Sequence, residues 1–307
     1  MDDRIRDYCR LGIVHYMLYK DTITGGGDHS SLISLLESPE FDAVECAWIN
    51  DDAMRAAVTR CKARNGKTIA FGAHPVLLTQ DLDLNSLDED HRRRAVSAVR
   101  AVVPQAYELG ATGFALLSGP ATGEADRARA TDRLVRSLTE IADTLADRGA
   151  IPLVLVSFDQ LDYGKNRLIG PNRAAAAVAR EVRKSHPSFG LMLDLSHLPL
   201  QGETPREAWD AAGEFVVHAH MGNCVKDKPG HPLNGDTHPP LCDPAGENCV
   251  AELAEYLQVL LGGGFLNRET RPVLSFEVSP HGEWTPDVVV EHSLATLEEA
   301  WEIVKAY

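Results

Sequence analysis

The stretch FGLMLDLSHLPLQGETPREAWDAAGEFVVHAHMGNC, residues Phe189–Cys224, decides how this chain is organised. It contains two short apolar runs, Gly190–Leu193 and Phe215–Val217, and acidic or imidazole side chains follow each run at once. A third apolar run, Pro272–Phe276, ends in the same way at Glu277. Carboxylate and imidazole groups at the ends of successive strands are the ligand types that a hard to borderline divalent cation needs.

The polar residues after the first two runs are Asp194, His197, His218 and His220. Because side chains alternate along a strand, His218 and His220 point the same way, and we expect both to face the interior of the fold. Structural roles stay open, since two histidines at this spacing also stack without a ligand and Asp194 would equally serve as a helix cap. Glu277 stands inside an apolar run, where a buried glutamate needs a cation or a proton.

Short apolar runs alternate with helical patterns along the whole chain. We predict eight β-rich runs: Leu11–Leu18, Asp42–Ile49, Thr68–Ala73, Gly113–Leu117, Ile151–Phe158, Gly190–Leu193, Phe215–His220 and Val273–Val278. This alternation implies parallel strands joined by right-handed crossovers, and eight such units close into a (β/α)8 TIM barrel. The alternative is a doubly wound open sheet, which is disfavoured because no GxGxxG motif follows the first run.

Capping signals place several helix ends. We predict helices over Ser31–Leu36, Ala53–Arg64, Asp126–Arg148, Pro205–Ala212 and Cys249–Leu261, and a last helix from Thr285 and Pro286 to Lys305. Asn50 and Asp51 are placed to cap the second of these helices. Ser86 and Glu89 have the spacing of a capping box for a long helix after the third run.

Composition indicates one globular domain over residues 1–307. The 307-residue chain is 44% hydrophobic and 24% charged, which is enough apolar residue content to bury a large core. A net charge of -15 argues against nucleic acid as a partner, because phosphates repel such a surface. No run reaches the roughly 20 apolar residues of a membrane helix. The charged N-terminus lacks the apolar segment of a secretory leader, so we expect a cytoplasmic protein.

The six cysteines are predicted to be free thiols, because none forms a CxxC pair and the expected compartment is reducing. They are Cys9, Cys46, Cys61, Cys224, Cys242 and Cys249.

In a TIM barrel the loops after the strands line the active face, so polar residues at the strand ends should meet at one mouth. These residues are His15, Glu45, His74, Ser118, Asp159, Asp194, His197, His218, His220 and Glu277. The loop between Gly222 and Asn248 is too long for a plain connection, and we expect it to cap the mouth and to bring His238 to it. Lys165, after the fifth run, is placed to bind substrate.

The segments MLDLSH, HAHMGN and SFEVSP resemble the sugar phosphate isomerase/epimerase family. These are xylose-isomerase-like (β/α)8 barrels, and they include ketose 3-epimerases and inosose dehydratases. The loop HPLNGDTHPP, followed by AGEN, is similar to a subgroup with a GD-x-HP signature. The resemblance implies a divalent metal, with Mn, Co, Mg or Zn as candidates, and carries its ligands over to Asp194, His220 and Glu277. It also matches His197 to a histidine that contacts substrate oxygens.

The fifth run departs from the family pattern. Related sequences read LEPFD where this chain has LVSFD, so Val156 stands where the family has a metal-binding glutamate. We predict that Asp159 supplies the fourth ligand instead. A valine cannot act as a base, so one of the two carboxylates that shuttle a proton in epimerisation is also absent.

The resemblance implies a metal-dependent isomerase, epimerase or β-eliminating lyase that acts on a sugar, polyol or keto sugar through an enediolate. Glu277 is the predicted base, with His197 and His218 as further catalytic residues. Glu45, His74, Lys165 and His238 are predicted to contact the substrate. A small carbohydrate-like molecule is thus the expected partner, and a homo-oligomer is left open.

Two other functions stay as alternatives. One is a metal-poor or non-catalytic sugar-binding or partner subunit on the same barrel, which the valine at position 156 suggests. The other is an endonuclease, which the negative charge disfavours because such an enzyme needs a basic face.

Overall fold

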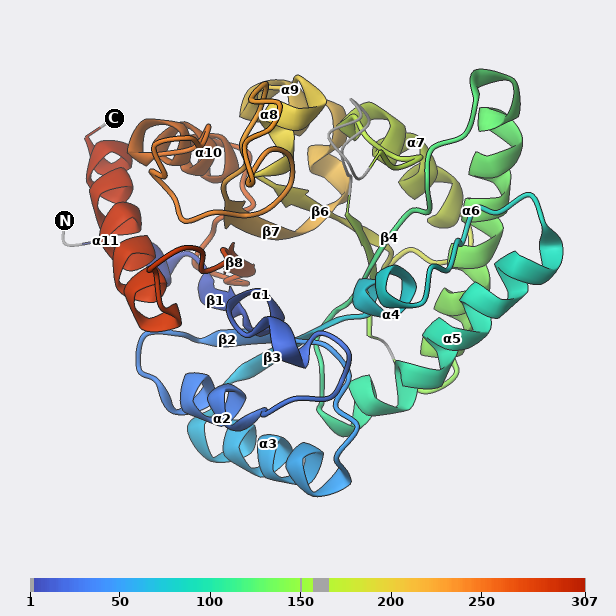
Figure 1. Ribbon diagram of the computed structural model, residues 1–307, viewed down its shortest axis with the longest axis horizontal. Helices are drawn as coiled ribbons and strands as arrows, with labels where there is room; N and C mark the ends of the chain where they lie inside the picture. Colours follow the sequence, from blue (N-terminus) through green and yellow to red (C-terminus); the bar gives the residue numbers. More distant parts are fainter. Residues whose placement is uncertain (1–2, 150, 157–165, 307) are drawn as a thin grey trace.

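The computed structural model of this protein describes residues 3–149, 151–156 and 166–306. Eight parallel strands form a closed barrel in chain order (Figure 1). The strands are β1 Arg10–Val14, β2 Ala43–Cys46, β3 Thr68–Gly72, β4 Phe114–Leu117, β5 Leu153–Val156, β6 Gly190–Asp194, β7 Val216–Gly222 and β8 Val273–Glu277. Because β1 pairs with both β2 and β8, the predicted TIM barrel is confirmed and the open sheet is excluded.

Helices form a ring around the barrel (Figure 1). They are α1 His15–Leu18, α2 Ser30–Glu37, α3 Asp52–Asn65, α4 His74–Thr79, α5 Glu89–Glu108, α6 Glu124–Ala146, α7 Asn172–Val182, α8 His197–Gln201, α9 Pro205–Ala212, α10 Val250–Gly262 and α11 Pro286–Lys305. The described residues also form three short 3-10 helices, η1 Ile5–Asp7, η2 Lys20–Thr22 and η3 Gly213–Phe215. Within the described parts of the chain, no helix has the length and apolar character that a membrane span requires.

Two local predictions need correction. The run predicted over Leu11–Leu18 is a strand only to Val14, because its second half turns into the short helix α1. The capping box predicted for Ser86 and Glu89 is wrong. Helix α5 begins at Glu89, and its cap is Asp88, whose Oδ1 accepts from the backbone N–H groups two and three residues further on at 2.9 and 3.3 Å.

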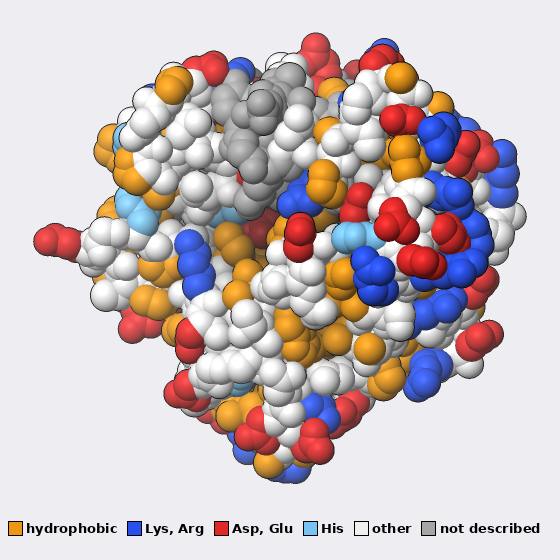
Figure 2. Space-filling model, turned by 45° about the vertical axis from the view of Figure 1, so that its right-hand side comes forward, with side chains coloured by type: hydrophobic (Ala, Val, Ile, Leu, Met, Phe, Trp, Pro, Cys, Tyr) orange, Lys and Arg blue, Asp and Glu red, His pale blue; other side chains and the backbone are white. Residues whose placement is uncertain are grey.

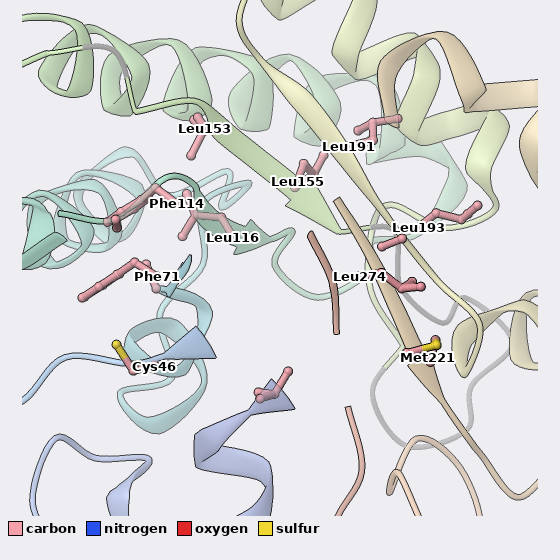
Figure 3. Close-up of a cluster of buried hydrophobic side chains, with 14 of the residues drawn as sticks. Cys46, Phe71, Phe114, Leu116, Leu153, Leu155, Leu191, Leu193, Met221 and Leu274 are labelled. Carbon is pink, nitrogen blue, oxygen red and sulfur yellow. The ribbon is translucent and has the colours of Figure 1, made fainter. Parts of the chain in front are cut away.

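The face of the barrel shown in Figure 2 is hollowed, and hydrophobic, acidic and histidine side chains lie around the hollow. The strands pack outward against the helices through a large hydrophobic core. Figure 3 shows part of this core, in which Phe114 and Leu116 of β4 and Leu153 and Leu155 of β5 are buried. Their neighbours along each strand point to the barrel interior, because side chains alternate.

One prediction about the cysteines is wrong. Cys242 and Cys249 form a disulfide with a Cα–Cα distance of 4.2 Å, while the other four cysteines are free and buried. The loop between them turns back on itself, and the Cys242 N–H donates to the Asn248 carbonyl at 2.9 Å. Asp243, Pro244 and Gly246 between them are turn-forming residues, but a turn signal alone does not show that the flanking thiols pair.

Candidate metal centre

The three metal ligands carried over from the resemblance lie together at the carboxyl end of the barrel. Asp194 ends β6, Glu277 ends β8, and His220 lies between them on β7, directly opposite Asp194 in the strand register. Their candidate ligand atoms all lie within 4.8 Å of one another. All three side chains are buried, so a cation among them would be shielded from water.

Each ring nitrogen of His220 lies at hydrogen-bond distance from a carboxylate oxygen. Its Nδ1 lies 2.6 Å from Oε2 of Glu277, and its Nε2 lies 3.0 Å from Oε1 of Glu45 on β2. The same Glu45 oxygen lies 2.7 Å from Nε2 of His218. Both imidazoles of β7 therefore face the barrel interior, and Glu45 fixes the orientation of both rings.

The two oxygens of Asp194 have different surroundings. Oδ1 accepts hydrogen bonds from the N–H and the hydroxyl of Ser196 at 2.8 and 2.7 Å. Oδ2 is buried and has no hydrogen-bond partner among the described residues. It lies 3.4 Å from Nε2 of His197 and 3.8 Å from Nδ1 of His220. A buried carboxylate oxygen without a hydrogen bond, aimed at two imidazoles, fits a cation ligand.

The long loop after β7 brings two more polar side chains to the same place. Nε2 of His238 lies 2.8 Å from Oδ1 of Asp236, and Nε2 of His197 lies 3.3 Å from the same oxygen. His238 also lies 3.9 Å from Oε1 of Glu277. His238 is thus near the site, as its predicted contact with substrate requires, whereas Asp236 was not among the predicted site residues, although the GD-x-H spacing of the loop was a signal for it.

Buried neighbours shift the pKa values of Glu45 and His220 in opposite directions. Burial alone would raise the pKa of Glu45, but the imidazoles of His218 and His220 outweigh it and hold this pKa well below its usual range. Burial alone would lower the pKa of His220, yet Glu45 and Glu277 raise it well above its usual range. Glu45 is therefore ionised at neutral pH.

The same competition operates at Asp194. Burial favours its neutral form, but His197, His220 and His238 lower its pKa below the usual range. For His197, burial favours the neutral ring, whereas the carboxylates of Asp194 and Asp236 raise the pKa to about 9. The carboxylates therefore favour positive charge on the imidazoles of this cluster.

The other predicted residues make contacts outside these ligand groups or fall outside the described residues. His74 lies 3.1 Å from the hydroxyl of Tyr16 through its Nε2. Nε2 of His15 lies 2.9 Å from Oγ of Ser31, and the hydroxyl of Ser118 accepts from the Ile169 N–H at 3.0 Å, a structural bond. The predicted ligand Asp159 and the predicted substrate contact Lys165 fall outside the described residues.

The fold and the position of this site define a class of protein. A family model described as "Xylose isomerase-like TIM barrel" matches residues 34–300, and the chain belongs to this family. The resemblance to xylose-isomerase-like barrels is therefore confirmed.

Individual relatives can be named. The chain is 26% identical to the D-psicose 3-epimerase of Ruminiclostridium cellulolyticum over 212 residues, which cover 66% of this chain and 69% of that protein. An L-ribulose 3-epimerase structure superposes with a TM-score of 0.74 at 17% identity, covering 97% of this chain and 96% of that one. A D-tagatose 3-epimerase-like protein gives 0.71 at 18% identity, with 97% and 98% covered. At these identities the structural matches show the fold alone.

Proposed function

We propose that this protein is a divalent-cation-dependent isomerase, epimerase or β-eliminating lyase that acts on a sugar or keto-sugar derivative. The observation that carries the proposal is the convergence of Asp194, His220 and Glu277, from three successive strands, within 4.8 Å of one another. The sequence similarity to a D-psicose 3-epimerase supports the same class of substrate.

The donor set fits such a cation. Oδ2 of Asp194, Nδ1 of His220 and a carboxylate oxygen of Glu277 would hold it, and two carboxylates with one imidazole suit Mn²⁺, Co²⁺, Mg²⁺ or Zn²⁺. When bound, the cation acts as a Lewis acid on a substrate carbonyl and its neighbouring hydroxyl.

The residues of the chain would then move the proton. Glu277 would remove the proton from the carbon next to the carbonyl, and its Oε2 lies 2.6 Å from Nδ1 of His220, so the two groups already share the position of the proposed cation. Glu45 holds the opposite nitrogen of His220 and so fixes the ring. His197 and His238 present their Nε2 atoms at the same end of the barrel and are placed to return a proton to substrate oxygen or carbon.

The valine on β5 favours chemistry on one face of the substrate. Val156 is register-paired with Met192 and packs among apolar residues, so the described part of β5 places no carboxylate on this wall. Epimerisation with a base on each face needs a second carboxylate opposite Glu277. A one-face reaction, either 1,2-isomerisation or β-elimination, needs only one.

Proton exchange with solvent tests this proposal. Protein stripped with a chelator and reloaded with Mn²⁺ or Co²⁺ is incubated in D2O with a panel of ketoses and inosose-type compounds, and deuterium at the α-carbon is followed by proton NMR. We expect incorporation into at least one compound, reduced by about 10²–10⁴-fold in Glu277→Gln, which removes the base.

The matched control is Glu283→Gln, an exposed glutamate in the loop after β8, which should exchange at the wild-type rate. Wild-type exchange in Glu277→Gln would refute the assignment of the base. Sugar binding without exchange in any compound would instead favour the non-catalytic binding subunit.

A further inference from the structure

The cysteines of this chain are of two kinds. Four are free and buried: Cys9, Cys46, Cys61 and Cys224. Burial raises the pKa of the Cys9 and Cys46 thiols to about 12, and it also raises the pKa of Cys224. A thiol that stays protonated at neutral pH is a poor nucleophile. Cys242 and Cys249 instead form a disulfide, and both side chains are partly exposed, so reagents in solution can reach them.

We propose that Cys242 and Cys249 are a thiol–disulfide exchange site, which a dithiol reductant opens and a disulfide oxidant closes. The redox state of the pair then sets how firmly the loop after β7 is held at the carboxyl end of the barrel. The inference goes beyond the proposed function and does not depend on it, because its readouts are thiol content and amide protection.

Cys249 lies where a thiolate is stabilised. It is the N-cap of α10, a helix of 13 residues, and its side chain accepts from the backbone N–H of Glu252. The helix dipole and the N–H groups at a helix N-terminus favour a negatively charged sulfur. The Glu252 carboxylate, which accepts from the Cys249 N–H at 3.0 Å, opposes this effect without removing the donor. Because the sulfur with the lower pKa leaves faster, Cys249 is the leaving sulfur and Cys242 is the one attacked.

Opening the pair transfers two electrons and two protons from the reductant. A thiolate of the dithiol attacks Sγ of Cys242, the bond between the two protein sulfurs breaks, and Cys249 leaves as a thiolate that takes up a proton. The second thiol of the reductant then attacks its own sulfur in the mixed disulfide and releases Cys242, so that the reductant becomes a disulfide and the pair becomes two thiols. Closing by an oxidant disulfide passes through a mixed disulfide in the reverse sense.

The disulfide closes a segment that reaches back to the candidate metal centre. Asn248, inside this segment, donates through Nδ2 to the carbonyls of Leu195 and Gly222 at 3.2 and 3.0 Å. Leu195 follows Asp194 directly, and Gly222 is the last residue of β7. The Cys242 N–H in turn donates to the Asn248 carbonyl at 2.9 Å. The disulfide thus helps to hold Asn248 against the strand ends that position Asp194.

The other side of the pair leads to His238, four residues before Cys242. Both residues lie in the left-handed region, with φ values of 52° and 60°, which a non-glycine residue adopts only when its surroundings enforce it. The His238 carbonyl accepts from the Ser279 N–H at 2.7 Å, and the Pro240 carbonyl accepts from Nδ2 of Asn223 at 2.8 Å. Opening the disulfide removes one of the restraints on this part of the loop.

Differential alkylation tests the exchange site on the wild-type chain. The folded protein is treated with dithiothreitol, alkylated with iodoacetamide at neutral pH, and analysed by peptide mass spectrometry. We expect both cysteines of the pair to be labelled and the buried thiols of Cys9, Cys46 and Cys224 to stay unlabelled. Glutathione disulfide should restore the pair once the reductant is removed. In Cys249→Ser it should leave a stable mixed disulfide on Cys242, because the second thiol is gone.

Hydrogen–deuterium exchange of the oxidised and reduced forms measures the effect on the loop. Peptides that cover residues 236–249 should exchange about tenfold faster or more in the reduced protein, because the cross-link no longer limits local opening. Peptides of β1, β2 and β3 should not change. The matched control is Cys224→Ala, a cysteine of the same loop outside the pair, whose loop should respond to reduction as the wild-type loop does.

Three results would overturn the inference. A pair that dithiothreitol reduces only after the chain is denatured is no exchange site, and neither are two free thiols that glutathione disulfide fails to join. A pair that opens with no change in the protection of residues 236–249 does not control the loop. None of these results bears on the proposed function, which α-proton exchange in wild type and Glu277→Gln tests separately.

Discussion

The two sides of the barrel interior differ sharply in chemistry. The β4–β5 side, with one residue of β6, is apolar and consists of Ala115, Leu117, Val154, Val156 and Met192. The side formed by β2, the end of β6, β7 and β8 carries Glu45, Asp194, His218, His220 and Glu277. The boundary crosses β6, where Met192 and Asp194 are two residues apart and face the same interior.

This difference suggests how the site is used. The carboxylates and imidazoles on the strands stand on the side of β2, the end of β6, β7 and β8, and the opposite side packs Leu78 of α4 against the apolar cluster. A substrate between them would meet charged groups on one face and carbon on the other. The asymmetry supports one-face proton transfer more than two-face epimerisation.

Placing a carboxylate on the apolar side should have the largest effect on stability. In Val156→Glu, a buried carboxylate among apolar residues loses its hydration, and we expect unfolding to become easier by about 3–5 kcal/mol at pH 8 for the metal-free protein. The loss should shrink at low pH, where the acid is neutral. Thermal and denaturant melts with and without Mn²⁺ measure both effects.

The matched variant is Val156→Met, which adds volume without charge and should cost about 1–3 kcal/mol with no pH or metal dependence. If Val156→Glu is as stable as Val156→Met at pH 8 without metal, this side of the barrel is not the dry surface that its composition indicates.

Two buried histidines with different neighbours have pKa values shifted in opposite directions. His15, at the end of β1, stacks against Tyr19 and His29 rather than against carboxylates. Burial, with a contribution from His29, lowers its pKa to about 3, whereas His197 in the charged cluster has a pKa of about 9. Position at a strand end therefore does not decide the charge of a histidine, and its neighbours do.

The depressed pKa of His15 predicts acid sensitivity. The unfolded chain takes up a proton near pH 6.5 and the folded chain only near pH 3, so stability from this group is complete above pH 6.5 and is lost as the pH falls towards 3. At pH 5 the loss is about 2 kcal/mol. Replacing His15→Gln should remove this term, so the stability gap between wild type and variant should change by that amount between pH 8 and pH 5.

Urea titrations at both pH values measure the gap, with His231→Gln as the control at a loop position outside the core. An equal acid dependence for wild type and His15→Gln would show that His15 is not held neutral in the fold.

Local signals made much of the fold predictable. Pro205 at the first helical turn and Thr285 as a cap gave helix starts that the structure reproduces. The alternation of runs and helices gave the barrel, since topology follows from parallel strands and crossovers. The strand-end positions of Asp194, His220 and Glu277 followed from the same alternation together with the family resemblance.

Contacts between distant parts of the chain were not predictable in the same way. Glu45 meets His218 across 173 residues of sequence, and only the closed barrel brings β2 and β7 to one interior. Asp236 depends on the path of an irregular loop, and so does the disulfide between Cys242 and Cys249. Such paths are set by side-chain to backbone bonds, such as those of Asn223, which have no periodic pattern.

In the proposed function, Asp194 anchors a cation on which proton transfer depends. The most direct measurement is metal content and α-proton exchange on the same preparations of wild type and Asp194→Asn, a change that preserves shape and removes the charge. We predict that Asp194→Asn loses the bound cation and that exchange falls by about 10²-fold or more in the same samples. A folded Asp194→Asn protein that keeps its metal and exchanges at the wild-type rate would contradict the claim.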